Sequence, residues 1–280
     1  MYLLFDIGGT NMRVAYAKDG IMFGEPFVEP TPKDFKVGIA KLAELGRRAA
    51  NNGAINAIAG GIAGPLDRGK TMLVNSPNLA GWVGKPLKKT LEQNFNAPAF
   101  LENDTAFGGL GEAMRGAGKG KGIVAYVTVS TGVNGVRIVD GVIDANAFGF
   151  EIGHQVVASG GEQCPSCSAS GHLESYISGA AMQKRYRKPP QEITDETVWE
   201  EAARMLAIGL NNTIVHWSPE IFVLGGSMMK QPGISFLRVK QYVRDILTIF
   251  PEIPEIVPAA LNDHGGLHGA LAFLARRVIE

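Results

Sequence analysis

The chain has 280 residues, of which 45% are hydrophobic and 19% charged, so it can bury a substantial core and disorder is excluded as its general state. Its 27 basic and 27 acidic residues cancel, which argues against a nucleic-acid-binding protein. The opening MYLLFD reaches Asp6 too soon for a signal peptide, no apolar run approaches the ~20 residues of a membrane span, and only two cysteines occur, so we expect a cytoplasmic protein without a membrane partner.

The first third of the chain predicts an antiparallel meander followed by alternating helices and strands. Apolar runs separated by a glycine turn at 6–11 and a hairpin turn at 18–20 predict three strands. Helical spacing of apolar residues then predicts the first helix over 34–52. The predicted strands are 2–5, 12–17, 21–28, 55–59 and 99–101, and the further helices are 85–95 and 104–114.

The plan then repeats. A shift of 121 residues superposes Thr10 on Thr131 and Asp19-Gly20 on Asp140-Gly141. Strands are predicted at 124–129, 133–139 and 142–143, a long helix at 194–217, and a strand at 221–224 that runs into a Gly-Gly pair, as the strand at 55–59 does. Chance could supply the glycine turns alone, but the matched order favours two homologous halves over a solenoid of ~20–50-residue units.

Each half has a glycine turn between its first two strands. In the first, Gly8 and Gly9 leave backbone N–H groups open to an anion, and Thr10 and Asn11 add side-chain donors. Asp6 is placed to hold Mg²⁺ through water, although a hairpin with a buried capping aspartate is the alternative. The segment 130–135 is the counterpart, and neither turn matches G-x-x-x-x-G-K-[ST]. The pair suggests a cleft with opposed phosphate-binding turns.

Three motifs, DIGGTNMR at 6–13, Glu102-Asn103-Asp104 and Glu151-Ile-Gly-His154, resemble the ROK family of sugar kinases and repressors. The resemblance extends to GGLHGA at 265–270 and so covers nearly the whole chain. It implies an α/β fold of the actin, Hsp70 and hexokinase group, with duplicated ribonuclease H-like domains flanking a cleft. We expect a small domain over 1–103, completed by a C-terminal helix at about 262–280, and a large domain over 104–261.

The resemblance also implies residue roles. Asp104 would be the catalytic base that accepts the proton of a sugar hydroxyl, whereas spacing alone favours a helix N-cap at this position. The residues expected to bind the sugar are Gly64, Asn78, Asn103, Asp104, Glu151, His154 and Glu174. Those expected to bind ATP with its Mg²⁺ are Asp6, Gly8, Gly9, Thr10, Asn11, Arg13, Thr131, Gly132, Asn134, Gly225, Gly226 and Ser227.

Two cysteines and two histidines have the spacing of a metal site. His154, Cys164, Cys167 and His172 fit a tetrahedral structural zinc. The family motif is Cys-x-Cys-Gly-x2-Gly-Cys-x-Glu. Here the first cysteine pair has one more intervening residue, and His172 stands where a cysteine is usual. A redox-active Cys-x2-Cys is the alternative, but its usual βαβ context is missing.

The resulting prediction is a homodimeric, ATP-dependent hexose kinase, with glucose as the expected sugar. Other hexoses and N-acetylhexosamines, including fructose, mannose, allose, N-acetylglucosamine and N-acetylmannosamine, stay open as substrates. Three further alternatives are a sugar-sensing regulator, a binding module without turnover, and a kinase that uses polyphosphate. Regulators of the family carry an N-terminal helix-turn-helix, for which the motif beginning at Asp6 leaves no room.

Overall fold

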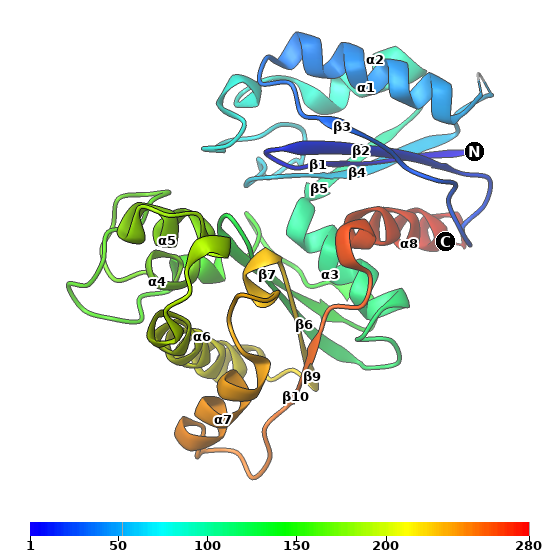
Figure 1. Ribbon diagram of the computed structural model, residues 1–280. Helices are drawn as coiled ribbons and strands as arrows, with labels where there is room; N and C mark the ends of the chain where they lie inside the picture. Colours follow the sequence, from blue (N-terminus) through cyan, green and yellow to red (C-terminus); the bar gives the residue numbers. More distant parts are fainter. Residues whose placement is uncertain (52, 280) are drawn as a thin grey trace. The chain divides into compact units, whose positions relative to one another are not determined.

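The computed structural model describes residues 1–51 and 53–279, so Asn52 and Glu280, the ends of the first and last predicted helices, lie outside the described residues. It is a mixed α/β structure with two five-stranded sheets (Figure 1). The chain divides into two compact units, described separately below. Unit 1 comprises 1–116, 141–149 and 261–280, and unit 2 comprises 117–140 and 150–260.

The sheet of unit 1 has the order β3-β2-β1-β4-β5. The first three strands are antiparallel, and β1, β4 and β5 are parallel. Because β1 and β4 are central and covered on both faces, their residues apart from Asp6 are apolar, aromatic or glycine, and most are buried. The strands are β1 (Tyr2–Ile7), β2 (Asn11–Ala17), β3 (Phe27–Pro30), β4 (Ala57–Ile62) and β5 (Ala99–Asn103).

The third predicted strand, 21–28, is wrong in its position. Ile21 and Met22 are 70% and 71% exposed, and only an isolated bridge between Ala17 and Phe23 continues the pairing from the hairpin turn. Pro26 has no N–H to donate to a neighbouring strand, so the ladder resumes only at β3. Apolar character alone could not distinguish an exposed hairpin from a strand.

Two pairs of helices cover the sheet of unit 1 (Figure 1). On one face lie α1 (Phe35–Ala49) and α2 (Leu87–Phe95). Trp82 of the short helix η1 (Ala80–Trp82) belongs to the same hydrophobic core. On the other face lie α3 (Asp104–Arg115) and α8 (Gly265–Ile279), which begins after η5 (Asn262–His264). Asp34 caps α1 by accepting a hydrogen bond from Val37 N–H at 3.0 Å.

Helices α3 and α8 pack backbone against backbone through glycines. A Cβ added at Gly269 would overlap the Phe107 carbonyl oxygen, and one at Gly111 would overlap the Gly265 carbonyl oxygen. Since α8 also packs on β1 and β4, these contacts group α3 with unit 1. Unit 1 therefore continues through α3 to Gly116.

Gly269→Ala is expected to destabilise the fold by ~1–3 kcal/mol, because the helices must separate to admit the methyl group. Gly265→Ala is the matched control, since its Cβ would meet only ordinary contacts, 3.6 Å from backbone atoms of Gly108. Thermal unfolding of both variants checks this. Equal melting temperatures for the two would contradict the tight glycine contact.

The second sheet, which lies in unit 2 except for its edge strand in the segment 141–149, repeats the topology of the first. Its order is β10-β9-β6-β7-β8, with β6 and β7 antiparallel and β6, β9 and β10 parallel. Read from β8, this sequence of pairings matches that of β3-β2-β1-β4-β5, which confirms the predicted duplication at the level of topology. The strands are β6 (Ile123–Val129), β7 (Val133–Val139), β8 (Val142–Ile143), β9 (Ile221–Gly225) and β10 (Glu255–Pro258).

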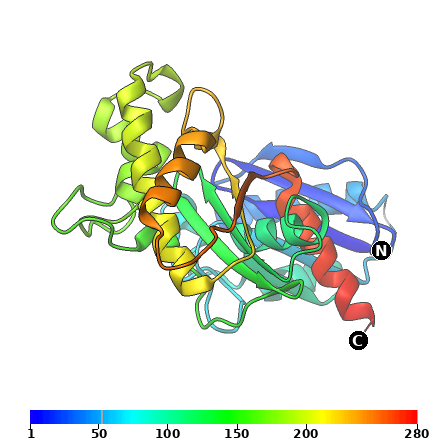
Figure 2. The same cartoon turned by 90° about the horizontal axis from the view of Figure 1, so that it is seen from below.

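The long helix α6 (Glu196–Trp217) was predicted, and α7 (Phe236–Ile246) lies beside it (Figure 2). Their apolar faces join residues of β6 and β9 in one core. Asp195 caps α6 through Thr197 N–H at 2.9 Å. The remaining helices are η2 (Ile152–His154), α4 (Glu174–Ile177), α5 (Gly179–Tyr186), η3 (Pro190–Glu192) and η4 (Ser227–Met229). No helix within the described residues is both long and apolar enough to span a membrane.

Candidate active site

Hydrogen bonds to its carbonyl groups hold the glycine turn of unit 1 in place. Gly8 N–H donates to the Asn11 carbonyl at 2.9 Å, which closes the turn between β1 and β2. The Thr31 hydroxyl donates to the Gly8 carbonyl at 2.8 Å, and Lys33 Nζ donates to the Gly9 carbonyl at 2.7 Å. Thr10, at the tip, is exposed. Because Gly8 N–H is engaged inside the turn, the expectation that it is open to an anion is wrong, and the turn can offer an anion the N–H groups of Gly9 and Thr10.

Asp6 lies in a cluster of charged groups at the end of β1. Arg13, its partner across the β1–β2 ladder, lies 3.7 Å from Asp6 Oδ2 and 3.4 Å from Asp263 Oδ2. A Cβ at Gly266 would lie 3.0 Å from Asp6 Cγ, so the carboxyl group lies against the first turn of α8. Burial, with the negative charges of Asp104 and Asp263, raises the pKa of Asp6 to about 7, although Arg13 acts in the opposite direction.

Asp6→Asn is therefore expected to stabilise the metal-free protein. In the unfolded chain this carboxyl ionises near pH ~3.9, so the folded protein holds its proton more tightly and loses stability as the pH rises from about 4 to 7. Asparagine removes this cost, by as much as ~4 kcal/mol above pH 7, while Arg13 keeps Asp263 as a partner. Thermal unfolding at pH 5 and pH 8 checks the difference. The same gain at both pH values would contradict it.

Asn103, and not Asp104, caps helix α3. Asn103 Oδ1 accepts hydrogen bonds from the N–H groups of Thr105 and Ala106 at 3.0 and 3.3 Å, and its Nδ2 donates to the Gly64 carbonyl at 3.1 Å. Asp104 is the first helical residue, and its Oδ1 accepts from Thr105 N–H at 2.8 Å. Spacing alone had favoured Asp104 as the cap, but the neighbouring amide performs that role.

Asp104 is partly buried and lies close to the strand beside it. A Cβ at Gly61 of β4 would lie only 2.8 Å from Asp104 Cα, so glycine is needed for the approach. Burial raises the pKa of Asp104, partly offset by its hydrogen bonds from Thr105. A buried carboxylate with increased proton affinity is suited to general-base catalysis.

The loop that carries Gly64 and Asn78 is fixed near these carboxylates. Gly64 has φ +128°, a conformation that favours glycine, and the Ser76 hydroxyl donates to the Ala63 carbonyl at 2.8 Å. Lys70 forms an ion pair with the buried carboxylate of Glu102, whose other oxygen accepts from Asn103 N–H at 3.0 Å. The sequence motif included Glu102, but nothing in it indicated Lys70 as the partner.

The two glycine motifs of unit 2 come together. Ser130 Oγ lies 3.1 Å from Ser227 Oγ, which connects the β6–β7 turn, containing Thr131 and Gly132, to the segment after β9. Gly226 has φ +98°, and a Cβ there would overlap the Val129 carbonyl oxygen, while Gly225 closely approaches the Tyr126 hydroxyl. Asn134 Oδ1, in β7, accepts a local hydrogen bond from Gly135 N–H at 2.7 Å. The contact places Ser130 beside Ser227, which the sequence had already predicted to bind the nucleotide.

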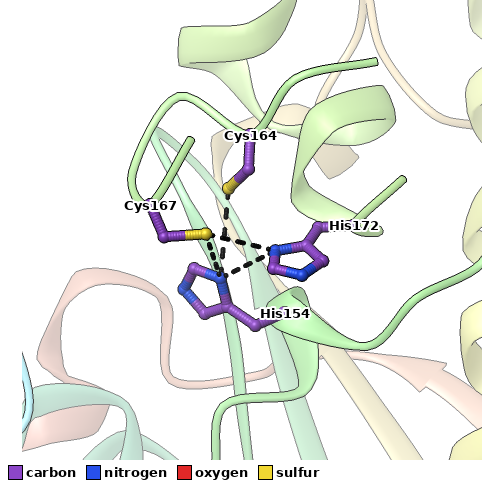
Figure 3. Close-up of side chains that lie close together, drawn as sticks. All are labelled: His154, Cys164, Cys167 and His172. Carbon is purple, nitrogen blue, oxygen red and sulfur yellow. Dashed lines mark hydrogen bonds between the residues drawn. The ribbon is translucent and has the colours of Figure 1, made fainter. Parts of the chain in front are cut away.

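The four predicted metal ligands converge (Figure 3). His154 Nδ1 lies 3.2 Å from His172 Nδ1, 3.5 Å from Cys167 Sγ and 3.9 Å from Cys164 Sγ, and Cys167 Sγ lies 3.3 Å from His172 Nδ1. A tetrahedral zinc with ordinary bond lengths separates two nitrogens by ~3.3 Å and a nitrogen and a sulfur by ~3.6 Å. The cluster therefore fits zinc in both donor type and spacing, Cys164 included.

The carboxylates of Glu151 and Glu174 lie next to this cluster. Glu151 Oε2 lies 3.9 Å from His154 Nε2, the ring nitrogen opposite the one that faces the cluster. Glu174 is 4% exposed, and one oxygen accepts from Val133 N–H at 2.9 Å while the other contacts the Ser166 hydroxyl. Since a Cβ at Gly132 would lie 2.8 Å from Glu174 Oε2, this carboxylate connects the glycine turn of unit 2 to the cysteine loop.

Comparison with known proteins places these features in a family. The model of the ROK family matches residues 2–277. A ROK hexokinase from Thermus thermophilus has a structure with TM-score 0.86 and 28% identity, and a ROK glucokinase from Streptomyces griseus, solved with glucose and AMPPNP, has TM-score 0.82 and 25% identity. In both comparisons 99% of each chain is covered.

Curated relatives have several activities. A glucokinase of Thermotoga maritima is 26% identical over 98% of this chain and 96% of its own, and an N-acetyl-D-glucosamine kinase of Escherichia coli is 28% identical over 98% and 99%. A xylose repressor of Bacillus spizizenii is 23% identical over 78% of this chain and 61% of its own. The chain belongs to the ROK family and has the fold of its sugar kinases, as the sequence motifs predicted.

Proposed function

We propose that this ROK protein is an ATP-dependent hexose kinase and that Asp104 is its general base. The observation that carries the proposal is the state of Asp104: it is packed against Gly61 of β4, its pKa is raised, and Asn103 performs the capping role that would otherwise explain it. Its proximity to Asp6, whose pKa it raises, adds a second carboxylate suited to Mg²⁺.

In this reaction Asp104 accepts the proton of a sugar hydroxyl as the hydroxyl oxygen bonds to the γ-phosphorus of ATP, and ADP leaves. The sugar-binding residues that we propose in unit 1 are Asn103, Gly64 and Asn78. In unit 2 the proposed sugar-binding residues are Glu151, His154 and Glu174. When bound, Mg²⁺ neutralises charge on the phosphates. The proposed nucleotide contacts are the turns at 8–11 and 131–134, the segment 225–227, and Asp6 with Arg13.

We propose that zinc is bound by His154, Cys164, Cys167 and His172 and has a structural role. The metal would fix the segment between His154 and His172 and the orientation of the His154 ring. With Nδ1 facing the metal, Nε2 of His154, which lies 3.9 Å from Glu151 Oε2, would be left to hydrogen-bond a sugar hydroxyl. The use of both cysteines as thiolate ligands agrees with a reducing cytoplasm.

The proposed assembly is a homodimer, on the basis of resemblance alone. Light scattering of the purified chain at micromolar concentration is expected to give twice the 29.8 kDa mass of one chain. A mass of one chain at that concentration would contradict the dimer.

A screen of ADP release across sugars tests the proposed function. Glucose is expected to give the highest kcat/KM, and fructose, mannose, allose, N-acetylglucosamine and N-acetylmannosamine are the alternatives. A parallel series replaces ATP with polyphosphate and measures the sugar phosphate formed, which identifies the phosphoryl donor. Binding of a sugar without any turnover from either donor would favour a sugar-sensing protein and contradict the kinase.

A further inference from the structure

The segment 31–34, between β3 and α1, contacts both a proposed nucleotide element and a proposed sugar element of unit 1. On one side, Thr31 N–H donates to the Thr10 carbonyl and its hydroxyl to the Gly8 carbonyl, each at 2.8 Å. On the other, Trp82 Nε1 donates to the Pro32 carbonyl at 2.9 Å. The backbone of this segment is thus held between the turn at 8–10 and the loop at 78–82.

Lys33 joins the two elements directly. Its Nζ donates to the Gly9 carbonyl at 2.7 Å and to the Asn78 carbonyl at 3.1 Å, across 24 and 45 residues of chain. Gly9 and Asn78 also touch, since a Cβ at Gly9 would lie 2.7 Å from Asn78 Cβ. One ammonium group therefore binds adjacent parts of the anion-binding turn and the sugar loop.

The Lys33 main chain is anchored independently of the ammonium group. A Cβ at Gly81 would overlap the Lys33 carbonyl oxygen, so the loop and the segment are in close backbone contact there. The neighbouring Asp34 caps α1 through Val37 N–H. Removing the amine of Lys33 should consequently leave the backbone path intact, and the two hydrogen bonds can be tested by themselves.

We propose that Lys33 is a positioning residue that couples nucleotide binding at the Gly8–Thr10 turn to sugar binding at the Asn78 loop. This inference rests on the proposed kinase function. An anion bound to the turn N–H groups orders the turn, and the Lys33 hydrogen bonds transmit that order to Asn78. Two ligands that favour the same arrangement of a connected element bind with positive coupling, and the coupling is reciprocal.

The test measures glucose binding by calorimetry with and without AMPPNP, for the unmodified protein and for Lys33→Met. AMPPNP is expected to tighten glucose binding by roughly 5–10-fold in the unmodified protein, near the low end of ordinary coupling, and by less than about 2-fold in Lys33→Met. Lys36→Met, an exposed lysine at the start of α1, is the matched control and should keep the full coupling. Equal coupling in Lys33→Met and the unmodified protein would overturn the inference.

A second measurement needs no ligand. Amide hydrogen exchange in the free protein is expected to speed up together at residues 8–10 and 78–80 in Lys33→Met, and at neither segment in Lys36→Met. If the unmodified protein binds neither glucose nor AMPPNP, the proposed function fails, and the exchange data then decide on the Lys33 connection alone. Unchanged exchange at both segments in Lys33→Met would reject that connection.

Discussion

Replacing Asp104 with asparagine is expected to lower kcat by ~10²–10⁴-fold, or about 3–5 kcal/mol of barrier, while sugar affinity changes little. Asparagine has a similar shape and can still hydrogen-bond a hydroxyl, but it cannot accept the proton. Helix α3 should keep its N-terminus, because the capping interactions come from Asn103. Steady-state kinetics and glucose calorimetry on this variant separate the loss of chemistry from a loss of binding.

Asp195→Asn is the matched control for this substitution. Asp195 is the N-cap of α6 and accepts from Thr197 N–H, and asparagine caps a helix about as well as aspartate. Its kcat should remain close to that of the unmodified protein. A capping role for Asp104 would make the two variants behave alike, so near-normal turnover of Asp104→Asn would end its assignment as the base.

Removing the metal is expected to weaken both stability and sugar binding. The purified protein should contain about one zinc per chain, and Cys167→Ser should lose most of it, because the site then keeps only three strong ligands. Since His154 is both a cluster residue and a neighbour of Glu151, sugar affinity should fall by ~10–100-fold with the metal. Elemental analysis, thermal unfolding and calorimetry on the same samples check the three expectations.

His172→Cys and His172→Ala form a matched pair for the same site. Cysteine restores the ligand type that the family motif has at this position and should retain zinc, whereas alanine should lose it. The two variants differ only in the ability to bind the metal, so a general effect of replacing the ring would lower zinc content in both. No metal in protein purified without chelators would contradict the proposed centre.

The repeated plan was readable from the sequence because its signals are local. Apolar runs separated by glycine turns, such as Gly8-Gly9, depend on neighbours within a few residues. The strand β10 was not predicted, because it is four residues long and prolines stand at 254 and 258. Helix α7 was also missed, although Phe236, Val239 and Val243 recur at helical spacing after the N-cap Ser235, so the sequence did contain a signal for it.

The sequence proposed the residues of the candidate site, but it did not indicate the contacts between them. Spacing could not decide whether Asn103 or Asp104 caps α3, because both types favour that position. The contacts of Lys33 with Gly9 and Asn78 connect segments that are far apart in the chain. A local sequence pattern does not indicate which distant residues contact each other. The convergence of His154, Cys164, Cys167 and His172 could be predicted because such residue types are rare and the spacing of metal ligands is restricted, even though His172 departs from the family motif.

The proposed activity is phosphoryl transfer from ATP to a sugar hydroxyl, and it can be measured directly by following the labelled γ-phosphate of ATP. The unmodified protein is incubated with γ-³²P-labelled ATP, Mg²⁺ and glucose, and the products are separated into sugar phosphate and inorganic phosphate. Labelled sugar phosphate is expected to form, and Asp104→Asn should lower the rate of its formation by at least ~100-fold. Label only in inorganic phosphate, or no turnover with glucose or any hexose or N-acetylhexosamine of the screen, would contradict it.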